Sequence, residues 1–377
     1  MQDVFIGFTS VFGSPDWWQP IVMYLVGFAL IWLAIKKEYE PMLLLPIGFG
    51  AILVNLPLSI AGVPTVPGYE TGFLQVLYEA GIKTELFPLL IFIAVGAMID
   101  FGPLFKNPMM IFFGAAAQFG IFFTMIAATL LGFGLKEAAA IGIIGSADGP
   151  TSIYVASRFA RNLLGPISVA AYSYMSLVPI IQPPVIKLLT TREERRIRMD
   201  GSQRPISRTT LILFPILVTL LTGFFAPTAV ALIGFLMFGN LVRECGVLKK
   251  LSLAAQNELS SLVTLLLGIT IASTMTADRF LQLSTLFIIG LGLLAFIFDT
   301  AGGVLFAKLL NLFLKRKVNP MVGAAGISAF PMSARVIHTM GLKEDPSNYL
   351  LMYAVSANVS GQIGSVLAGG LILALVH

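Results

Sequence analysis

The stretch from Gly142 to Ser152 reads Gly-Ile-Ile-Gly-Ser-Ala-Asp-Gly-Pro-Thr-Ser and interrupts an otherwise apolar run. Its one acid, Asp148, would cost roughly 2.5–3.5 kcal/mol in the middle of a bilayer, and such residues mark functional sites by default. Glycine and proline at membrane depth indicate a broken helix, which is tolerated only where it is buried in protein or lines a water-filled cavity. The stretch therefore predicts a cation site built from an acid and unwound backbone.

The composition of the whole chain is that of a membrane protein. Of the 377 residues, 57% are hydrophobic and 11% are charged, whereas soluble domains have about 25% charged residues. We therefore expect an all-α, polytopic protein of about 10 spans in the cell (inner) membrane. The single cysteine, Cys245, excludes an internal disulfide. The chain has no GxxxxGK[ST] motif, which excludes an ATP-driven pump.

Ten apolar runs are near the ~20 residues that a helix needs to cross the hydrocarbon core. They are 20–35, 42–61, 86–101, 108–132, 166–189, 209–226, 228–242, 259–277, 281–310 and 349–376. The block 62–84 is rich in proline and glycine and predicts an extramembrane loop with a short interfacial helix.

Basic residues orient these spans. The loop 190–208 carries six arginines, which places it in the cytoplasm. The other basic clusters fall on the same side if the N-terminus is outside. For all these loops to lie on one side, the segment 138–160 must enter the membrane from the outer side and return to it. Alternatively, it is a pair of broken helices that together leave the sidedness of the later loops unchanged.

A second irregular stretch, 318–340, follows a basic cluster and so enters from the inner side. Comparing the two stretches at an offset of 181 residues aligns Gly142 with Gly323, Gly145 with Gly326, Pro150 with Pro331, Ser152 with Ser333, Val155 with Val336 and Tyr172 with Tyr353. Two copies in opposite orientation are the inverted repeats of alternating-access transporters. The alternative is chance matching of residues that are common in membranes.

The expected organisation follows from these two stretches. It comprises N-terminal scaffold spans and an outer loop (1–84), repeat 1 with the broken stretch 138–160 (85–189), a cytoplasmic basic loop with linking spans (190–257), and repeat 2 with the broken stretch 318–340 (258–377). We expect the two repeats to form a core that moves against the remaining spans.

Asp148 is the leading cation ligand, because a carboxylate beside free carbonyls and hydroxyls supplies the oxygen shell that hard cations prefer. The alternative is that Asp148 caps a short helix, and the two roles can coexist. Asn319 and Ser328 are neutral oxygen donors in the second stretch, although Asn319 before Pro320 also fits a helix N-cap. Asp299 is either a second ion ligand or a helix-packing residue.

Arg335 lies inside the second broken stretch. A guanidinium at that depth requires an acid, a carboxylate substrate or backbone carbonyls, unless its side chain reaches the membrane interface. Polar residues such as Tyr174 and Asn358 in the following spans are individually weak signals, because similar residues also hold membrane helices together.

Three segments resemble the β subunit of sodium-translocating biotin-dependent decarboxylases, which act on oxaloacetate, methylmalonyl-CoA or glutaconyl-CoA. They are Gly145-Ser146-Ala147-Asp148-Gly149-Pro150-Thr151-Ser152-Ile153, Ala171 to Pro179, and Asn319-Pro320 through Val336, and the later run from Asn348 to Gly361 is also similar. The similarity covers essentially the whole chain, and its motifs are long and specific.

The resemblance implies a translocase that decarboxylates carboxybiotin presented by a partner, consumes a proton and exports sodium. The partners it implies are a biotin-carrier subunit, a carboxyltransferase (α) subunit and a small membrane anchor subunit, and we also expect a homo-oligomer in the membrane. It assigns sodium to Asp148, Asn319, Ser328, Tyr174 and Asn358, with Asp148 and Asn319 holding one ion and Tyr174 with Ser328 another.

The resemblance also assigns the reacting group. Arg335 would position the carboxylate of carboxybiotin, and Ser328 and Tyr174 would assist catalysis. Without the resemblance, the residues fit equally well a sodium-coupled symporter for a small organic anion or a sodium/proton antiporter. A purely structural scaffold fits poorly, because it has no need of two broken helices and an intramembrane acid.

Overall fold

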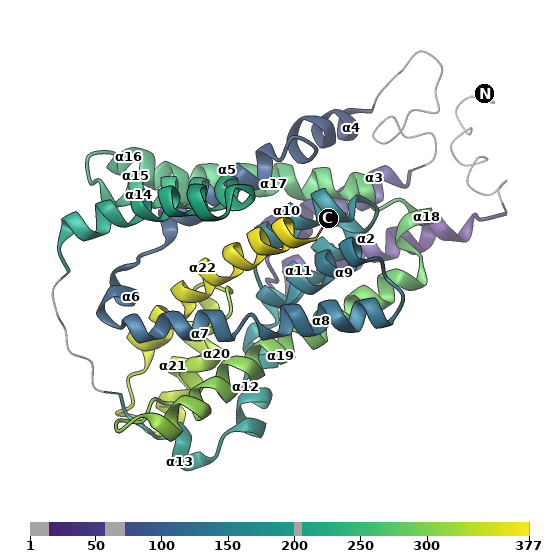
Figure 1. Ribbon diagram of the computed structural model, residues 1–377. Coiled ribbons are helices and arrows are strands. Elements are labelled where there is room, and N and C mark those ends of the chain that lie inside the picture. The colour runs from purple at the N-terminus through teal and green to yellow at the C-terminus, as the bar shows by residue number, and fades with distance from the viewer. Residues whose placement is uncertain (1–14, 57–71, 200–205, 377) are drawn as a thin grey trace.

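The computed structural model describes residues 15–56, 72–199 and 206–376, and in these ranges the chain is helical with no strand (Figure 1). The main helices are α2 (Trp18–Lys36), α3 (Pro41–Val54), α5 (Leu86–Met98), α7 (Ile111–Ala116), α8 (Phe119–Leu130), α9 (Leu135–Gly142), α10 (Gly149–Phe159), α11 (Leu164–Ser176), α12 (Val178–Leu189), α14 (Arg208–Phe225), α15 (Val230–Glu244), α17 (Ser260–Ile271), α19 (Leu283–Phe313), α21 (Met332–Glu344) and α22 (Leu351–Leu375). Short helices are α4 (Phe73–Leu77), α6 (Gly102–Lys106), α13 (Arg192–Arg195), α16 (Lys249–Ala254), α18 (Ala277–Phe280) and α20 (Met321–Ala324).

Six helices of the described part are long and apolar enough to cross a membrane, and the number rises to 8 if each of two bent pairs is one span. Each of the six overlaps an expected span. They are Trp18–Lys36, Pro108–Leu130, Arg208–Phe225, Lys249–Thr274, Leu283–Phe313 and Leu351–Leu375. The coarse prediction of an all-α polytopic fold is therefore confirmed, while the count of about 10 spans is not.

The four other expected spans differ from simple crossing helices. The run 166–189 is bent by 68° between α11 and α12, because Pro179 has no N–H for the carbonyl four residues earlier and so cannot continue α11, whereas it is tolerated in the first turn of α12. The run 86–101 is the 13-residue α5, which is bent by 58° against Phe73–Ile82.

The last two of these runs are short helices. The run 228–242 forms the 15-residue α15, and 42–61 forms the 14-residue α3, with 57–61 outside the described residues. The expected loop 62–84 is helical over Phe73–Ile82, and its first part, 62–71, is likewise outside the described residues.

Both glycine-rich stretches break their helices where the sequence predicts. In the first, α9 passes into the 3-10 turn η4 (Ile143–Ser146), and Ala147 takes a left-handed backbone with φ 55° before α10 begins. In the second, the four residues of α20 are separated from α21 by an irregular segment. A left-handed alanine is strained, and such strain persists only where the surroundings fix it. The breaks are therefore built into the fold.

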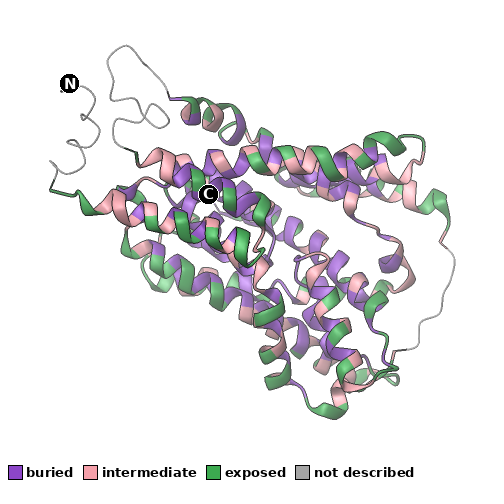
Figure 2. Ribbon diagram, turned by 180° about the vertical axis from the view of Figure 1, so that it is seen from behind, coloured by how far each residue is buried: buried purple, intermediate pink, exposed green. Residues whose placement is uncertain are grey.

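The buried residues form one continuous core along the central helices (Figure 2). Of the candidate spans, α22 has the largest buried share and α14 the smallest. Apolar side chains such as Leu217 and Phe224 of α14 are exposed, as expected of a face that meets lipid rather than water. The two broken stretches thus lie in the interior, behind a peripheral shell of apolar helices.

Helix α19 and the second broken stretch touch backbone to backbone. A Cβ built on Gly303 would lie 2.1 Å from the carbonyl oxygen of Gly323, and one built on Gly323 would lie 2.0 Å from that of Gly303. Small residues at such contacts let membrane helices approach closely. No side chain fits here without moving the two backbones apart.

We expect Gly303→Ala to lower the melting temperature of the detergent-solubilised protein, because overpacking a tight contact costs about 1–3 kcal/mol. The matched control is Gly290→Ala on the same helix, where an added Cβ meets nothing within 4 Å. That variant should melt at or above the wild-type temperature, since alanine favours helix over glycine. Equal melting temperatures for the two variants would contradict this account of the contact.

Candidate functional site

The two broken stretches meet at one point in the interior. The N–H of Ser328 donates to the carbonyl oxygen of Ser146 at 3.0 Å. Gly326 of the second stretch packs on the carbonyl of Phe113 in α7, and Gly145 of the first packs on Ala295 in α19. Each break is therefore held against a span from the other half of the chain.

Asp148 lies at this crossing and is 5% exposed. Its carboxylate accepts a hydrogen bond from the N–H of Thr151 at 3.3 Å and from the Thr151 hydroxyl at 2.7 Å. It is therefore the N-cap of α10, as one of the two alternatives predicted. Its Oδ2 also accepts from the Ser365 hydroxyl of α22 at 2.6 Å, so capping leaves the carboxylate joined to a second element.

Ser365 connects Asp148 with the second broken stretch. Its Oγ lies 2.7 Å from the hydroxyl of Ser328, which also donates to the carbonyl of Gly361 at 2.8 Å. The hydroxyls of Thr151, Ser365 and Ser328 are all buried. Ser365 was not among the predicted residues, although it lies seven residues after Asn358 and hence on the same face of α22.

The side chain of Asn358 has a buried oxygen that accepts no hydrogen bond from the described residues. Its side-chain N–H donates to the carbonyl of Ile327 at 2.6 Å, while its Oδ1 is buried and has no hydrogen-bond partner in the described part of the chain. Gln362, one turn further along α22, donates to the carbonyl of Ser328. A buried acceptor oxygen without a donor requires an explanation, and a bound cation is one that suits its chemistry.

The two tyrosines of α11 lie in different places. The ring of Tyr172 packs on Gly149, so closely that a Cβ there would lie 2.1 Å from its Cζ. The hydroxyl of Tyr174 donates instead to the carbonyl of Ile289 in α19. In this conformation Tyr172 therefore lies beside the residue that follows Asp148, and Tyr174 and Ser328 bond to different groups.

Asn319 is also engaged away from Asp148. Its side-chain N–H group donates to the carbonyls of Arg195 and Ile197, each at 2.9 Å, and its Oδ1 accepts from the N–H of Met321 at 3.0 Å. These bonds tie the start of the second broken stretch to the arginine-rich loop. Shared sodium binding by Asp148 and Asn319 stays a prediction that this conformation does not display.

Arg335 lines a cavity of about 520 Å³ between α12 and α21. Two further basic residues, Lys187 and Lys343, share its wall with apolar side chains such as Met332 and Val336. Its one acid, Glu344, is paired with Arg195 at 2.7 Å, and this hydrogen bond holds the pKa of Glu344 below its usual value. The cavity therefore presents uncompensated positive charge to an anion.

A buried polar junction lies between the same helices. The amide of Gln182 in α12 donates to the carbonyl of Ala324 at 2.9 Å and accepts from the Ser333 hydroxyl of α21 at 3.0 Å. Ser333 is two residues before Arg335, so the junction connects the wall of the cavity with the second broken stretch. Gln182 was missed because a glutamine between prolines in an apolar run gives no recognisable pattern.

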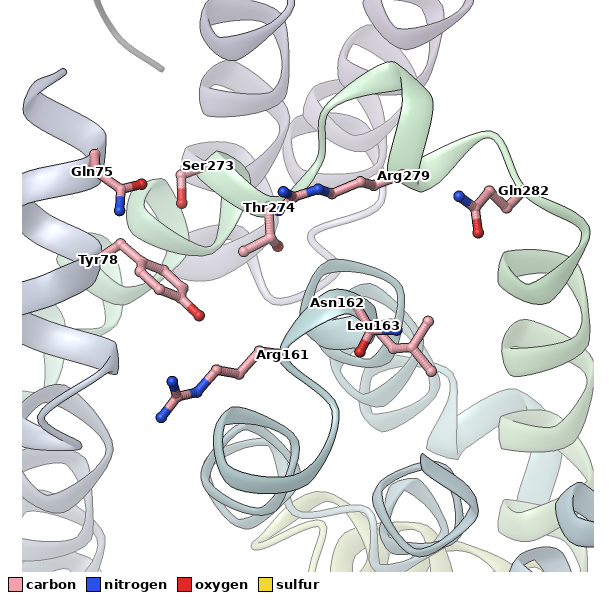
Figure 3. A pocket seen from close by; sticks show the side chains of 9 residues that line it. All are labelled: Gln75, Tyr78, Arg161, Asn162, Leu163, Ser273, Thr274, Arg279 and Gln282. Carbon is pink, nitrogen blue, oxygen red and sulfur yellow. The ribbon is translucent and has the colours of Figure 1, made fainter. Parts of the chain in front are cut away.

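A second cavity, of about 530 Å³, lies near α4 and α18, at the end of the molecule far from α13 (Figures 1 and 3). Arg161, Arg279 and Tyr78 surround it from different segments of the chain (Figure 3). None of the predicted site residues lines this cavity. The candidate site is thus the crossing together with the cavity at Arg335.

These features define a class, a multi-pass helical membrane protein in which two broken helices cross at a buried acid. A family profile described as Na+-transporting oxaloacetate decarboxylase beta subunit matches residues 19–376. The chain belongs to this family. It is accordingly the membrane subunit of a decarboxylase coupled to sodium transport, as the sequence predicted.

Individual relatives of this chain are also β subunits of such decarboxylases. The chain is 52% identical over 361 residues to glutaconyl-CoA decarboxylase subunit beta of Acidaminococcus fermentans, covering 95% of this chain and 94% of the relative. It is 52% identical over 355 residues to methylmalonyl-CoA decarboxylase subunit beta of Veillonella parvula, covering 94% and 92%. It is 45% identical over 411 aligned residues to the oxaloacetate decarboxylase beta chain of Klebsiella pneumoniae, covering 94% of each.

Proposed function

We propose that this chain decarboxylates carboxybiotin delivered by a biotin-carrier partner and uses the reaction to export sodium. The observation that carries the proposal is the hydrogen-bonded connection of Asp148, Ser365 and Ser328, which joins the two broken stretches at a buried acid. Loss of CO2 breaks the bond between the biotin ring nitrogen and the carboxyl carbon. The electron pair stays on nitrogen, which takes up one proton.

The cavity at Arg335 suits the carboxybiotin group. Its apolar wall fits the ring and the chain of biotin, and its three basic side chains fit the carboxylate. A guanidinium offers a planar pair of donors to a carboxylate. The cavity lies between α12 and α21, close to the arginine-rich loop whose charge predicts the cytoplasmic side, where a soluble carrier would arrive.

The crossing suits a sodium ion. Asp148 supplies the negative charge, and Ser328, Ser365 and the unpartnered Oδ1 of Asn358 supply neutral oxygens around it. Hard cations take such oxygen shells. We propose that Asn319 and Tyr174 enter the sodium shells in another conformation of the cycle, after their present bonds have broken.

Matching hydrogen bonds and helix irregularities support two inverted repeats. The Ser152 hydroxyl lies 3.4 Å from the carbonyl of Ile143, and 181 residues later the Ser333 hydroxyl lies 3.3 Å from the carbonyl of Ala324. Short π-helical turns also stand near the start of both proposed repeats, at Tyr78–Ile82 and Ala255–Leu259. We propose that these repeats move against the scaffold of 1–84 and the linking spans of 190–257.

The energetics of this coupling are favourable. Moving one charge against 100 mV costs about 2.3 kcal/mol, which the release of CO2 can supply. A ligand shifts a two-state equilibrium only by its differential affinity. Decarboxylation must therefore change which state the crossing favours, and the junction of Gln182 and Ser333 provides a physical connection between the cavity and the second broken stretch.

As a β subunit the chain works in a complex with other subunits. We propose that these are a biotin carrier, a carboxyltransferase (α) subunit and a small membrane anchor subunit, and that the chain is a homo-oligomer in the membrane. The carboxyltransferase would select the metabolite, since nothing at the Arg335 cavity needs to recognise more than carboxybiotin.

Reconstitution of the complex in proteoliposomes tests the proposal. Radioactive sodium should accumulate only while carboxybiotin is consumed, and blocking biotin with avidin should stop both processes. Uptake of a labelled organic anion by this chain without partners would instead favour a symporter. Proton flux on a sodium gradient without any carboxylated substrate would favour an antiporter.

We expect Ser365→Ala to raise the sodium concentration that half-saturates transport by about tenfold or more, because a hydrogen bond to a charged group contributes about 1.5–3 kcal/mol. The matched control is Ser360→Ala on the same helix. The Ser360 hydroxyl donates to the carbonyl of Ile111, away from Asp148. If both variants showed the wild-type sodium dependence, Ser365 would have no part in the ion site.

A further inference from the structure

Asp299 is a buried acid that the proposed site does not use. It lies in the middle of α19 and is 0% exposed. Its Oδ1 accepts a hydrogen bond from the N–H of Gly120, the second residue of α8. Because α8 begins inside the span Pro108–Leu130, its first N–H groups have no partners within the helix, and Asp299 satisfies one of them from another span.

The other carboxyl oxygen faces the first broken stretch. Oδ2 of Asp299 has no hydrogen-bond partner among the described residues. A Cβ built on Gly145 would lie 2.5 Å from it, so the absence of a side chain at Gly145 is what allows the contact. The two faces of this carboxyl are therefore a helix N-terminus and the backbone of η4.

Among the described residues, no basic side chain is paired with Asp299. The groups that face it, Gly120 from α8 and Gly145 from η4, do not ionise. The titratable groups on α19 and on the elements packed against it are Asp148 after η4, Lys136 and Glu137 of α9, Tyr172 and Tyr174 of α11, Lys187 of α12 and Lys308 of α19 itself. None of these has a hydrogen bond or ion pair with Asp299 in the described chain.

An isolated ionised carboxylate in a dry interior is so unfavourable that the group binds a proton instead. A protonated Asp299 also suits its two neighbours. Its Oδ1 can still accept the hydrogen bond from the N–H of Gly120, and its protonated Oδ2 is uncharged where it contacts Gly145. At the offset of 181 residues Asp299 corresponds to Gln118 (299 − 181 = 118), whose Oε1 is likewise buried without a donor. The first half thus has a neutral group where the second has one that can ionise.

We propose that Asp299 is a proton-binding site of the transport cycle and that the first broken stretch closes it. The proposal rests on the proposed function, in which the reaction consumes a proton and the stretch around Asp148 moves. While Gly145 lies on Oδ2, water is excluded and the proton cannot exchange. When the stretch moves to change access to Asp148, the same movement uncovers Oδ2 and lets the acid lose or regain one proton.

This arrangement ties proton exchange to sodium access through one element. Gly145 and Asp148 are three residues apart in the same broken stretch. A shift of η4 therefore acts on the sodium ligand and on the cover of Asp299 together. Helix capping alone predicts no such coupling, because an asparagine could accept the Gly120 N–H equally well.

Asp299→Asn separates these two roles. It keeps an oxygen for the Gly120 N–H and has almost the shape of the protonated acid, but it cannot release a proton. In proteoliposomes we expect proton uptake and coupled sodium transport to fall about 100-fold, the size typical of removing a proton-transfer group, with an unchanged melting temperature. Thr300→Val, a buried neighbour whose hydroxyl also has no partner, should transport like wild type.

A direct readout does not depend on activity. The infrared spectrum of the wild-type protein should contain a protonated-carboxyl band that Asp299→Asn removes and Thr300→Val retains. Wild-type transport and proton uptake in Asp299→Asn, or an unchanged carboxyl band, would overturn this proposal. Failure of the wild-type complex to pump sodium on carboxybiotin consumption would instead overturn the proposed function, so the two failures are distinguishable.

Discussion

Replacing Asp148 by asparagine should lower sodium transport and the sodium-dependent part of decarboxylation about 100-fold, equivalent to about 2.7 kcal/mol. The carboxylate supplies negative charge to the connection of Asp148, Ser365 and Ser328, so without it a cation would be buried among neutral oxygens. Asparagine still accepts from the Thr151 N–H and can cap α10. The fold should therefore survive the change.

Two measurements separate loss of the ion from loss of the fold. Sodium uptake into proteoliposomes reports transport, and thermal melting with and without sodium reports binding, because a ligand stabilises the state that binds it. The control is Asp278→Asn, which changes an exposed acid in α18. Wild-type transport by Asp148→Asn would show that the sodium site lies elsewhere.

Replacing Arg335 by glutamine should have a comparable effect on decarboxylation itself. Arg335 is exposed in its cavity, and a hydrogen bond to a charged group contributes about 1.5–3 kcal/mol, so carboxybiotin turnover should fall about tenfold or more. Arg335→Lys keeps the charge but loses the planar pair of donors, and we expect it to be intermediate. Release of CO2 from carboxylated carrier protein measures the step without transport.

A control for charge alone is Lys249→Gln, which changes an exposed basic residue at the start of α16, away from the cavity. This variant should decarboxylate at the wild-type rate. Sodium-dependent stabilisation should persist in Arg335→Gln, because Asp148 and its partners are intact. If Arg335→Gln turned over carboxybiotin normally, the cavity between α12 and α21 would not be the reaction site.

The sequence predicted the two breaks because glycine, proline and a buried acid act locally on the backbone. The structure has Asp148 at the first break as the N-cap of α10, while its binding of sodium stays a prediction. The count of about 10 spans is not confirmed, since Pro179 bends the run 166–189 and α3 and α15 are only 14 and 15 residues long. Apolar composition indicates that a segment is buried, but it does not distinguish a straight helix from a bent one.

The partners of the site residues were harder to predict. Ser365 bonds to Asp148 across 217 residues of sequence, and nothing in a serine of a small-residue helix indicates this. Asn319 has the expected polar character, yet its partners are backbone carbonyls of Arg195 and Ile197, which carry no sequence pattern. Residue type indicates what a side chain can bond, whereas only the fold shows which group it meets.

The bonds of Asn319 have a mechanical consequence. The segment around Arg195 is fastened to the beginning of the second broken stretch through Asn319 and to the end of α21 through Glu344. It is also fastened to α19, where Lys308 donates to the carbonyl of Leu189. This basic segment is therefore bonded to both the start of the second broken stretch and the end of α21. A protein that binds the segment from the aqueous side would act on both of these elements at once.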